Sequence, residues 1–253
     1  MVSAASKGLG FGIAQELARN GATVCIASRT KTEIEAAAER LRNETGATIH
    51  SMVTDVSSPE SVQNWISEII NSFERIDGLV VNAGGPPPGN FDDFDDKDWE
   101  SAFYLTLMSA VRLIRGVLPS MRAGGGGSIL TVTSLSVKEP INRLLLSNVF
   151  RSGVTSLVKS LSNELASENI RINNLFPGRI DTDRVKSLDK SLAEKEGVSM
   201  REIKSKFEKS IPAGRYGTIE EFGKAGAFLL SNAASYITGA SLAVDGGLIK
   251  TVW

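Results

Sequence analysis

The sequence predicts a single-domain α/β protein with a doubly wound parallel sheet, Rossmann-like, in three layers of helix, sheet and helix. Two observations support this fold class. Short apolar runs alternate with longer amphipathic stretches, and the runs are apolar throughout rather than at every second residue. Strands buried on both faces have this property, and right-handed crossovers then place helices on both faces of the sheet. At 253 residues an open α/β sheet forms one domain, which we assign to residues 1–253.

The predicted elements follow one another in a regular order. The apolar runs predict strands at residues 23–27, 48–53, 78–82, 128–133, 171–176 and 241–244. Amphipathic stretches between them predict helices at residues 12–20, 31–45, 59–74, 98–122, 147–167 and 219–232. A further strand of about five residues should precede the first helix, in the middle of the sheet. Only Met1 and Val2 stand there, so we expect either residues upstream or a start assigned at an internal methionine.

Residues 183–212 interrupt this alternation. The segment is polar with a helical pattern, and it follows the strand predicted at 171–176. Insertions after the carboxyl end of a strand commonly act as lids over a binding site. We therefore interpret residues 183–212 as a helical lid or substrate loop, with an inert surface excursion as the alternative.

Composition excludes several classes of function. The net charge of −1 gives no global attraction to nucleic acid or to an anionic membrane, and no apolar run reaches about 18 residues, so no membrane-spanning helix is expected. The one cysteine, Cys25, cannot form an internal disulfide, which fits a reducing, cytoplasmic compartment. The one histidine, His50, has no Cys/His cluster around it, so we predict no metal site.

A glycine-rich segment at residues 3–13 carries the first functional motif. Gly8 and Gly10 allow the backbone to approach a diphosphate closely, and the helix that follows offers free N–H groups at its N-terminus. The candidate cofactor-binding residues in this segment are Ser3, Ser6, Lys7, Gly8, Leu9 and Gly10. A glycine turn alone is weak evidence, but its position inside a βαβ unit strengthens it.

Four further segments follow along the chain: Asp55-Val56, Asn82-Ala83-Gly84, residues 177–182 and a C-terminal pattern at residues 238–247. Together with the glycine-rich turn, they resemble the short-chain dehydrogenase/reductase family over nearly the whole chain, in particular its divergent 3-oxoacyl-acyl-carrier-protein reductase-like branch. Thr238-Gly239 and the run from Val244 to Gly247 match the C-terminal pattern of the family. The resemblance implies a homotetramer and a small-molecule carbonyl or acyl substrate. It also implies cofactor contacts at Asp55, Val56, Asn82, Ala83, Gly84, Pro177, Gly178, Ile180 and Thr182.

The end of the second predicted strand bears on the choice of cofactor. It reads Ser28-Arg29 and has no Asp or Glu to bind the ribose hydroxyls of NAD. Ser28, Arg29 and Lys7 are donors that suit a 2′-phosphate, which a carboxylate would repel. In the family, basic residues at these two places accompany NADP. We therefore predict NADP(H) in preference to NAD(H), with unliganded surface cations as the alternative.

The catalytic positions depart from the family pattern, which implies a tetrad of Asn, Ser, Tyr and Lys. Ser134 stands at the serine position, Ser147 at the tyrosine position thirteen residues later, and Arg151 at the lysine position four further on. Thr106 stands at the asparagine position. A serine hydroxyl is a much poorer acid than a phenol, and arginine stays protonated near neutrality. Ser147 and Arg151 nevertheless share one helix face.

Two hypotheses about function follow. The first is an NADP(H)-dependent oxidoreductase in which Ser134 holds the substrate oxygen, Arg151 orients the ribose, and Ser147 or water carries the proton. The second is a catalytically weak or inactive NADP(H)-binding protein with a regulatory or structural role. Arg143 and Arg184 are predicted to flank the cleft as candidates for an anionic substrate group, with solvated surface arginines as the alternative.

Overall fold

A single parallel sheet of seven strands organises the computed structural model, which describes residues 1–252. The strand order is β3-β2-β1-β4-β5-β6-β7, so the direction of winding reverses between β1 and β4. This confirms the predicted fold class. Ligands of such sheets bind where the winding reverses, outside the carboxyl ends of the strands. The strands are β1 Val2–Ser3, β2 Val24–Ser28, β3 Ile49–Val53, β4 Gly78–Val81, β5 Gly127–Val132, β6 Ile170–Pro177 and β7 Ser241–Val244.

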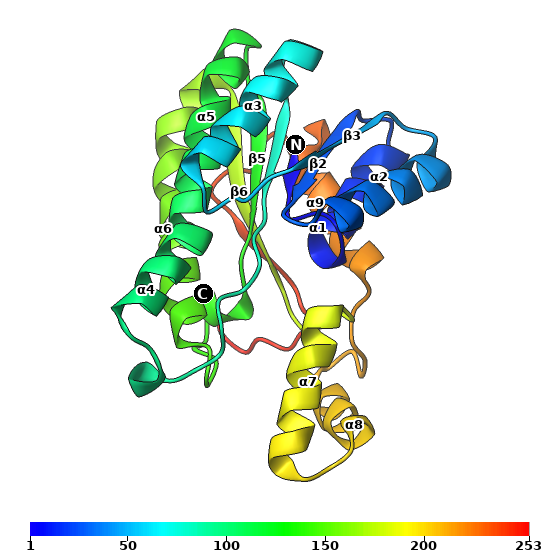
Figure 1. Ribbon diagram of the computed structural model, residues 1–253, viewed down its shortest axis with the longest axis vertical. Coiled ribbons are helices and arrows are strands. Elements are labelled where there is room, and N and C mark those ends of the chain that lie inside the picture. The colour runs from blue at the N-terminus through cyan, green and yellow to red at the C-terminus, as the bar shows by residue number, and fades with distance from the viewer. Residues whose placement is uncertain (253) are drawn as a thin grey trace.

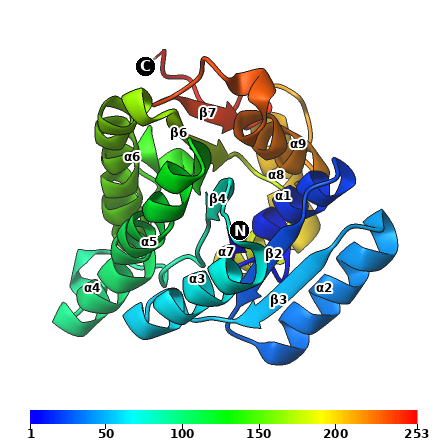
Figure 2. The same cartoon turned by 90° about the horizontal axis from the view of Figure 1, so that it is seen from above.

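Helices cover both faces of the sheet. In Figures 1 and 2, α3, α5 and α6 lie on one side and α1, α2 and α9 on the other. The two apolar cores match these layers: Trp65, Leu113 and Ile129 belong to the first, Ile13 and Phe222 to the second. The helices of the two layers are α1 Gly8–Arg19, α2 Lys31–Thr45, α3 Pro59–Phe73, α4 Asp96–Ala102, α5 Ser109–Ala123, α6 Leu145–Leu165 and α9 Ile219–Leu230.

Helices α1 and α9 approach each other closely because glycines line their crossing. A Cβ atom on Gly12 would lie 2.4 Å from the carbonyl oxygen of Ile219, and one on Gly223 would lie 2.3 Å from the carbonyl oxygen of Gly12. Any side chain at either position would force the helices apart. The crossing fixes α1, and with it the glycine turn that precedes α1.

The first strand is present but short. β1 pairs in parallel with β2 through Val2 and Ile26, and with β4 through Val2 and Val80. The amino group of Met1 donates to the carbonyl oxygen of Gly78 at 2.8 Å. The described chain thus places a two-residue strand at the centre of the sheet, where the sequence predicts a longer one.

The helix predicted at residues 98–122 is interrupted. Between α4 and α5 the chain forms a π-helical segment, Phe103–Met108, and π segments are common at functional sites. The stretch Asp96–Ala123 is long and apolar enough to cross a membrane by length and composition, which corrects our expectation that no segment qualifies. However, Leu113 and Val117 are fully buried in the core beneath the sheet, and core helices of this kind pass the same test.

Two further helices, α7 Asp183–Glu196 and α8 Met200–Ser210, project beyond the carboxyl ends of the strands (Figure 1, yellow). They account for the helical pattern predicted at residues 183–212. Asp189 anchors α7: its buried carboxylate pairs with Arg179 and accepts from Tyr216 Oη at 2.9 Å. Burial raises the pKa of Tyr216 to about 12, so its hydroxyl remains a donor. The role of these helices as a lid stays a prediction.

Candidate functional site

A cleft of about 1370 Å³ opens at the carboxyl ends of the strands, beside the point where the winding reverses. It is larger than the roughly 300–1,000 Å³ of a single-ligand pocket. The structure brings most of the predicted site residues to its wall. These are Ser6, Lys7, Gly8, Leu9, Ser28, Arg29, Val56, Asn82, Ala83, Gly84, Ser134, Ser147, Arg151, Pro177, Gly178, Ile180 and Thr182.

The glycine turn forms one end of the cleft. Gly8 has φ +62°, a conformation that glycine adopts without strain, and Gly10 packs so closely that a Cβ would lie 2.7 Å from the carbonyl oxygen of Ala4. Helix α1 begins after Lys7 with no side-chain cap and no acidic residue in its first turn. Its N–H groups and partial positive charge are therefore available to an anion such as a diphosphate.

Asn82 and Ser3 hold this turn against the neighbouring strand. Asn82 Nδ2 donates to the carbonyl oxygen of Ala4 at 3.1 Å, where Ala4 has the left-handed φ of +48°. Ser3 Oγ donates to the carbonyl oxygen of Asn82 at 2.7 Å and accepts from its N–H at 2.9 Å. Ser3 is fully buried and Gly10 is packed inside the turn, so neither lines the cleft. Both residues shape the turn from behind.

Unpaired hydroxyl groups lie in the cleft at the carboxyl ends of β2 and β3. Ser28 Oγ and Thr54 Oγ1 are buried and have no hydrogen-bond partner within residues 1–252. Asp55 does not line the cleft, and its carboxylate accepts from the N–H and hydroxyl of Ser57. Lys7 pairs with Glu33 at 3.1 Å, so a carboxylate stands beside the cation that we assign to the 2′-phosphate. Glu33 was absent from the sequence-based site, since its position there depends on how α2 leaves β2.

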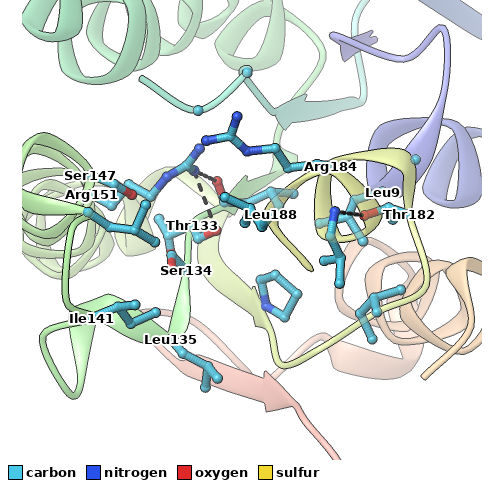
Figure 3. Close-up of a pocket in the computed structure, with 18 of the residues that line it drawn as sticks. Leu9, Thr133, Ser134, Leu135, Ile141, Ser147, Arg151, Thr182, Arg184 and Leu188 are labelled. Carbon is cyan, nitrogen blue, oxygen red and sulfur yellow. Dashed lines mark hydrogen bonds between the residues drawn. The ribbon is translucent and has the colours of Figure 1, made fainter. Parts of the chain in front are cut away.

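Ser134 and Ser147 lie at the other end of the cleft (Figure 3). Ser134 Oγ accepts from the N–H of Ser136 at 3.2 Å, which leaves its own hydrogen free to donate. Ser147 is buried in the first turn of α6, one turn before Arg151. The two serines therefore offer hydroxyl donors where the polar wall meets the apolar side chains of Leu135 and Ile141.

Arg151 is buried at the same end of the cleft. Nη1 donates to the carbonyl oxygens of Val132 at 2.9 Å and Thr133 at 3.4 Å, and Nη2 donates to that of Ala83 at 3.4 Å. Burial, and secondly the positive charge of Arg184, lower the pKa of Arg151 to about 10. The group is therefore still a cation at neutral pH, held at the ends of β4 and β5.

Thr106 does not line the cleft, although its neighbour Leu105 does. It sits in the π-helical segment, almost fully buried, and its Oγ1 has no hydrogen-bond partner in the described part of the chain. Residues that the sequence did not single out complete the wall, and among them are apolar side chains of α7, α8 and the C-terminal segment. They include Leu188, Leu192, Phe207, Leu248 and Ile249.

Comparison with known proteins identifies the family. Residues 3–249 match the family model described as enoyl-(acyl carrier protein) reductase. The chain is 32% identical to the 3-oxoacyl-(acyl-carrier-protein) reductase of Chlamydia muridarum, over 98% of this chain and 96% of that protein. The chain belongs to the short-chain dehydrogenase/reductase family. As a member, it is an oxidoreductase of the short-chain type, and its relatives include ketoreductases.

Solved structures of other short-chain dehydrogenases/reductases have the same fold. The L-sorbose reductase of Gluconobacter frateurii, in complex with NADPH and L-sorbose, superposes with a TM-score of 0.94 at 31% identity, covering 99% of this chain and 96% of that one. An NADPH-bound short-chain oxidoreductase of Pseudomonas aeruginosa PAO1 has a TM-score of 0.90 at 26% identity, covering 99% and 96%. That protein is described as containing an atypical catalytic center.

Proposed function

We propose that this protein catalyses NADP(H)-dependent hydride transfer to or from a carbonyl or secondary alcohol, in the manner of a 3-oxoacyl-acyl-carrier-protein reductase. One observation carries the proposal. A single cleft joins the uncapped N-terminus of α1 to a group of donors at Ser134, Ser147 and Arg151. The helix N-terminus suits a diphosphate, and the group of donors suits a carbonyl oxygen. The cofactor and the substrate would therefore meet between these two parts of the cleft.

The residues of the cleft fit a dinucleotide. Gly8 and Leu9 would take the diphosphate, with Gly10 shaping the turn behind them, and the unpaired hydroxyl of Ser28 with Arg29 would take a 2′-phosphate. Lys7 would also contact the 2′-phosphate by giving up its ion pair with Glu33. This pair is exposed and contributes little to stability. NADPH-bound relatives support the use of NADP(H), and the cations Lys7 and Arg29 at the cleft support it in preference to NAD(H). Val56 would face the adenine, and Ile180 and Thr182 the nicotinamide end, with Asp55 and Thr106 acting from outside the cleft.

When bound, the cofactor supplies a hydride to the carbonyl carbon, so the π pair moves onto the carbonyl oxygen, which must gain one proton. Ser134 Oγ–H holds that oxygen, because its lone pair already accepts from Ser136. Ser147, or a water that it orients, gives the proton. Arg151 stabilises the developing negative charge and orients the ribose, because its guanidinium stays charged in a buried site.

We also propose a cytoplasmic homotetramer. Exposed apolar side chains on the outer face of the helical layer and along β7 support this assembly. They include Val149 on α6, Tyr104 in the π-helical segment, Leu242 on β7 and Tyr236. β7 is an edge strand, and edges with exposed apolar residues commonly pair with a second chain. A mass of one chain in light scattering after gel filtration would overturn this part.

Two titrations and one assay test the function. Quenching of tryptophan fluorescence should give a dissociation constant for NADPH at least about tenfold below that for NADH. NADPH oxidation is then followed against a panel of ketones and 3-oxoacyl thioesters. We expect slow turnover, because losing a matched general acid costs roughly 10²–10⁴-fold.

Variants assign the roles. Ser134→Ala should lower kcat about tenfold or more without changing NADPH affinity, whereas Arg151→Ala should lower both. Arg115→Gln, an exposed arginine of α5 outside the cleft, is the matched control. NADPH binding without any turnover would favour the regulatory hypothesis, and no binding of either nucleotide would rule out the proposed function.

A further inference from the structure

Two guanidinium groups lie side by side in the cleft. Arg151 reaches in from α6, and Arg184 reaches in from the first turn of α7; Figure 3 shows the two groups directed toward one another. The loop after β4 lies against both. Arg151 Nη2 donates to the carbonyl oxygen of Ala83 at 3.4 Å, and Arg184 Nη2 donates to that of Pro86 at 3.3 Å.

Neither group has an acidic partner. Within residues 1–252, no carboxylate lies within 4 Å of Arg151 or Arg184, whereas Arg179, Arg122 and Arg215 each pair with one. Arg151 is buried, so its charge is poorly screened, and Arg184 adds a repulsive field. Two adjacent cations at the wall of an open cleft form a site where an anionic oxygen group would be strongly favoured.

The position of the pair distinguishes two sources of such a group, the cofactor diphosphate and the substrate. The glycine turn lies against Thr182, whose methyl group is 3.7 Å from a Cβ built on Gly8. Arg184, by contrast, lies against Gly85 and Pro86, beside Arg151 and the end of β5 that leads to Ser134. Leu135, Ile141 and Leu188 supply apolar wall around that end.

We propose that Arg184 binds a carboxylate on the substrate, with the adjacent charge of Arg151 favouring it, so that the substrate is an oxo acid with an apolar body. The proposal rests on the proposed function and names its substrate class. Arg184 is then a specificity-determining residue, because it contacts substrate away from the reacting carbonyl. Its guanidinium would form a two-pronged contact with the carboxylate that a lysine cannot reproduce.

Binding of matched probes tests this proposal on the intact protein saturated with NADP⁺. Hexanoate and hexanamide have the same shape and differ in charge, and their affinities are measured by calorimetry. We expect hexanoate to bind at least about tenfold more tightly. Arg184→Gln should reduce that ratio below about two, Arg184→Lys should retain part of it, and Arg115→Gln should leave it unchanged. In turnover, Arg184→Gln should raise KM for 5-oxohexanoate about tenfold, with kcat nearly unchanged and with no effect on its methyl ester.

The outcomes separate this proposal from the proposed function. Equal affinity for hexanoate and hexanamide in the wild type overturns the proposal. If Arg184→Gln weakens NADP⁺ about tenfold and leaves the probe ratio intact, the pair serves the diphosphate; this also overturns the proposal but leaves the function standing. If neither nucleotide binds, the function fails. The ratio of the hexanoate to the hexanamide affinity is then measured without nucleotide. A ratio of at least about ten supports the carboxylate site, and equal affinities overturn it.

Discussion

Arg151 Nη1 donates to the main-chain carbonyl of Val132 at 2.9 Å, and this bond joins α6 to the last residue of β5. Ser134 follows β5 after one residue, Thr133, so the same side chain that brings positive charge to the cleft also positions the serine beside it. Arg151 therefore contributes to both structure and chemistry. The effect of replacing it is for this reason compared with the effect of a variant that also changes Ser147.

Ser147→Tyr combined with Arg151→Lys should increase kcat. A phenol is a stronger acid than a serine hydroxyl, and a neighbouring ammonium favours its ionisation, so we expect a gain of about 10²-fold for a ketone substrate. Steady-state NADPH oxidation measures it. Arg151→Lys alone is the control and should be slower than wild type, because it gives up hydrogen bonds to buried carbonyls. No gain in a folded double variant would show that the cleft is not otherwise arranged for this chemistry.

Gly84→Ala should weaken NADPH binding about tenfold or more while leaving the protein stable. A Cβ on Gly84 meets no atom within 4 Å, yet Gly84 lines the cleft, so the added methyl group fills space that the cofactor needs. Fluorescence titration and thermal unfolding measure the two effects. Gly10→Ala is the contrasting variant. A Cβ at this position would collide with Ala4 and Asn82, so the substitution should lower the free energy of unfolding by about 1–3 kcal/mol. Unchanged NADPH affinity in Gly84→Ala would place the cofactor elsewhere.

Asp189→Asn should release α7. The buried carboxylate neutralises Arg179 and accepts from Tyr216, and breaking a buried pair leaves an uncompensated charge. We expect proteolysis within residues 183–212 to accelerate at least about tenfold, with Tyr216→Phe intermediate because it loses one hydrogen bond. Lys190→Gln, an exposed position on α7, should cleave at the wild-type rate. Equal rates in Asp189→Asn and wild type would mean that other contacts hold the helix.

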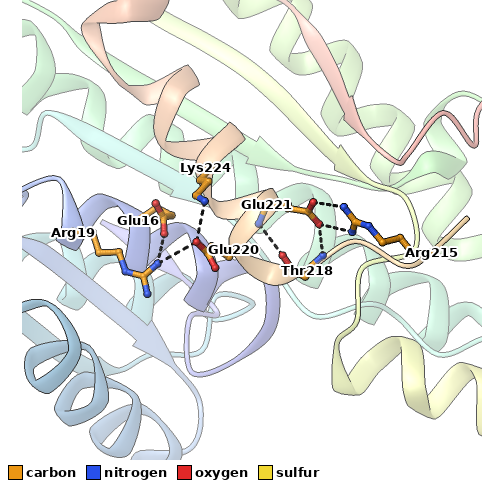
Figure 4. A network of polar contacts seen from close by, with 7 residues as sticks. All are labelled: Glu16, Arg19, Arg215, Thr218, Glu220, Glu221 and Lys224. Atoms are coloured by element: carbon orange, nitrogen blue, oxygen red, sulfur yellow. Dashed lines mark hydrogen bonds and ion pairs between the residues drawn. The ribbon is translucent and has the colours of Figure 1, made fainter. Parts of the chain in front are cut away.

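Glu221→Gln should lower stability at neutral pH but not in acid. Glu221 accepts from Arg215 and from the N–H of Thr218 at the start of α9 (Figure 4), and these contacts lower its pKa to about 2. Because the folded pKa lies below the unfolded one, the stabilisation is complete above about pH 4.5 and is lost as the pH falls toward 2. The side chain is partly exposed, so solvent screening reduces the effect to about 1 kcal/mol.

Urea unfolding at pH 7 and at pH 2.5 measures this difference. Glu100→Gln, an exposed position of α4 without an ion pair within the described residues, is the control and should match wild type at both values. A difference between Glu221→Gln and wild type that persists unchanged at pH 2.5 would mean that the amide fails to cap the helix, rather than that a charge is lost.

Much of the fold could be predicted because buried strands and amphipathic helices each have a recognisable local pattern of apolar and polar residues. The predicted helix at 31–45 and strand at 241–244 have the observed bounds. The π-helical segment at Phe103–Met108 could not be predicted, because one extra residue per turn leaves no trace in composition. Helix α1 begins at Gly8 rather than at residue 12, because close packing at Gly10 and Gly12 outweighs the low helix propensity of glycine.

The residues of the cleft could be predicted as a group because the carboxyl ends of parallel strands meet at one edge of the sheet. Side-chain relationships between distant elements could not. The pair between Lys7 and Glu33 depends on the path of α2, and the approach of Arg184 to Arg151 depends on where α7 comes to lie. Thr106 shows that spacing along the chain can also mislead. Its position in the sequence predicts a residue at the site, but Thr106 lies in a π-helical segment and does not line the cleft.

The glycine crossing of α1 and α9 has a consequence for biosynthesis. Gly12 leaves the ribosome early, but Gly223 follows only after strands β2 to β6 have been made. Until then α1 has α2 and β2 beside it but not α9, and long-range contacts of this kind form slowly. The nascent chain therefore lacks one side of this crossing for most of translation, and α1 and the glycine turn gain their full support only near the end of synthesis.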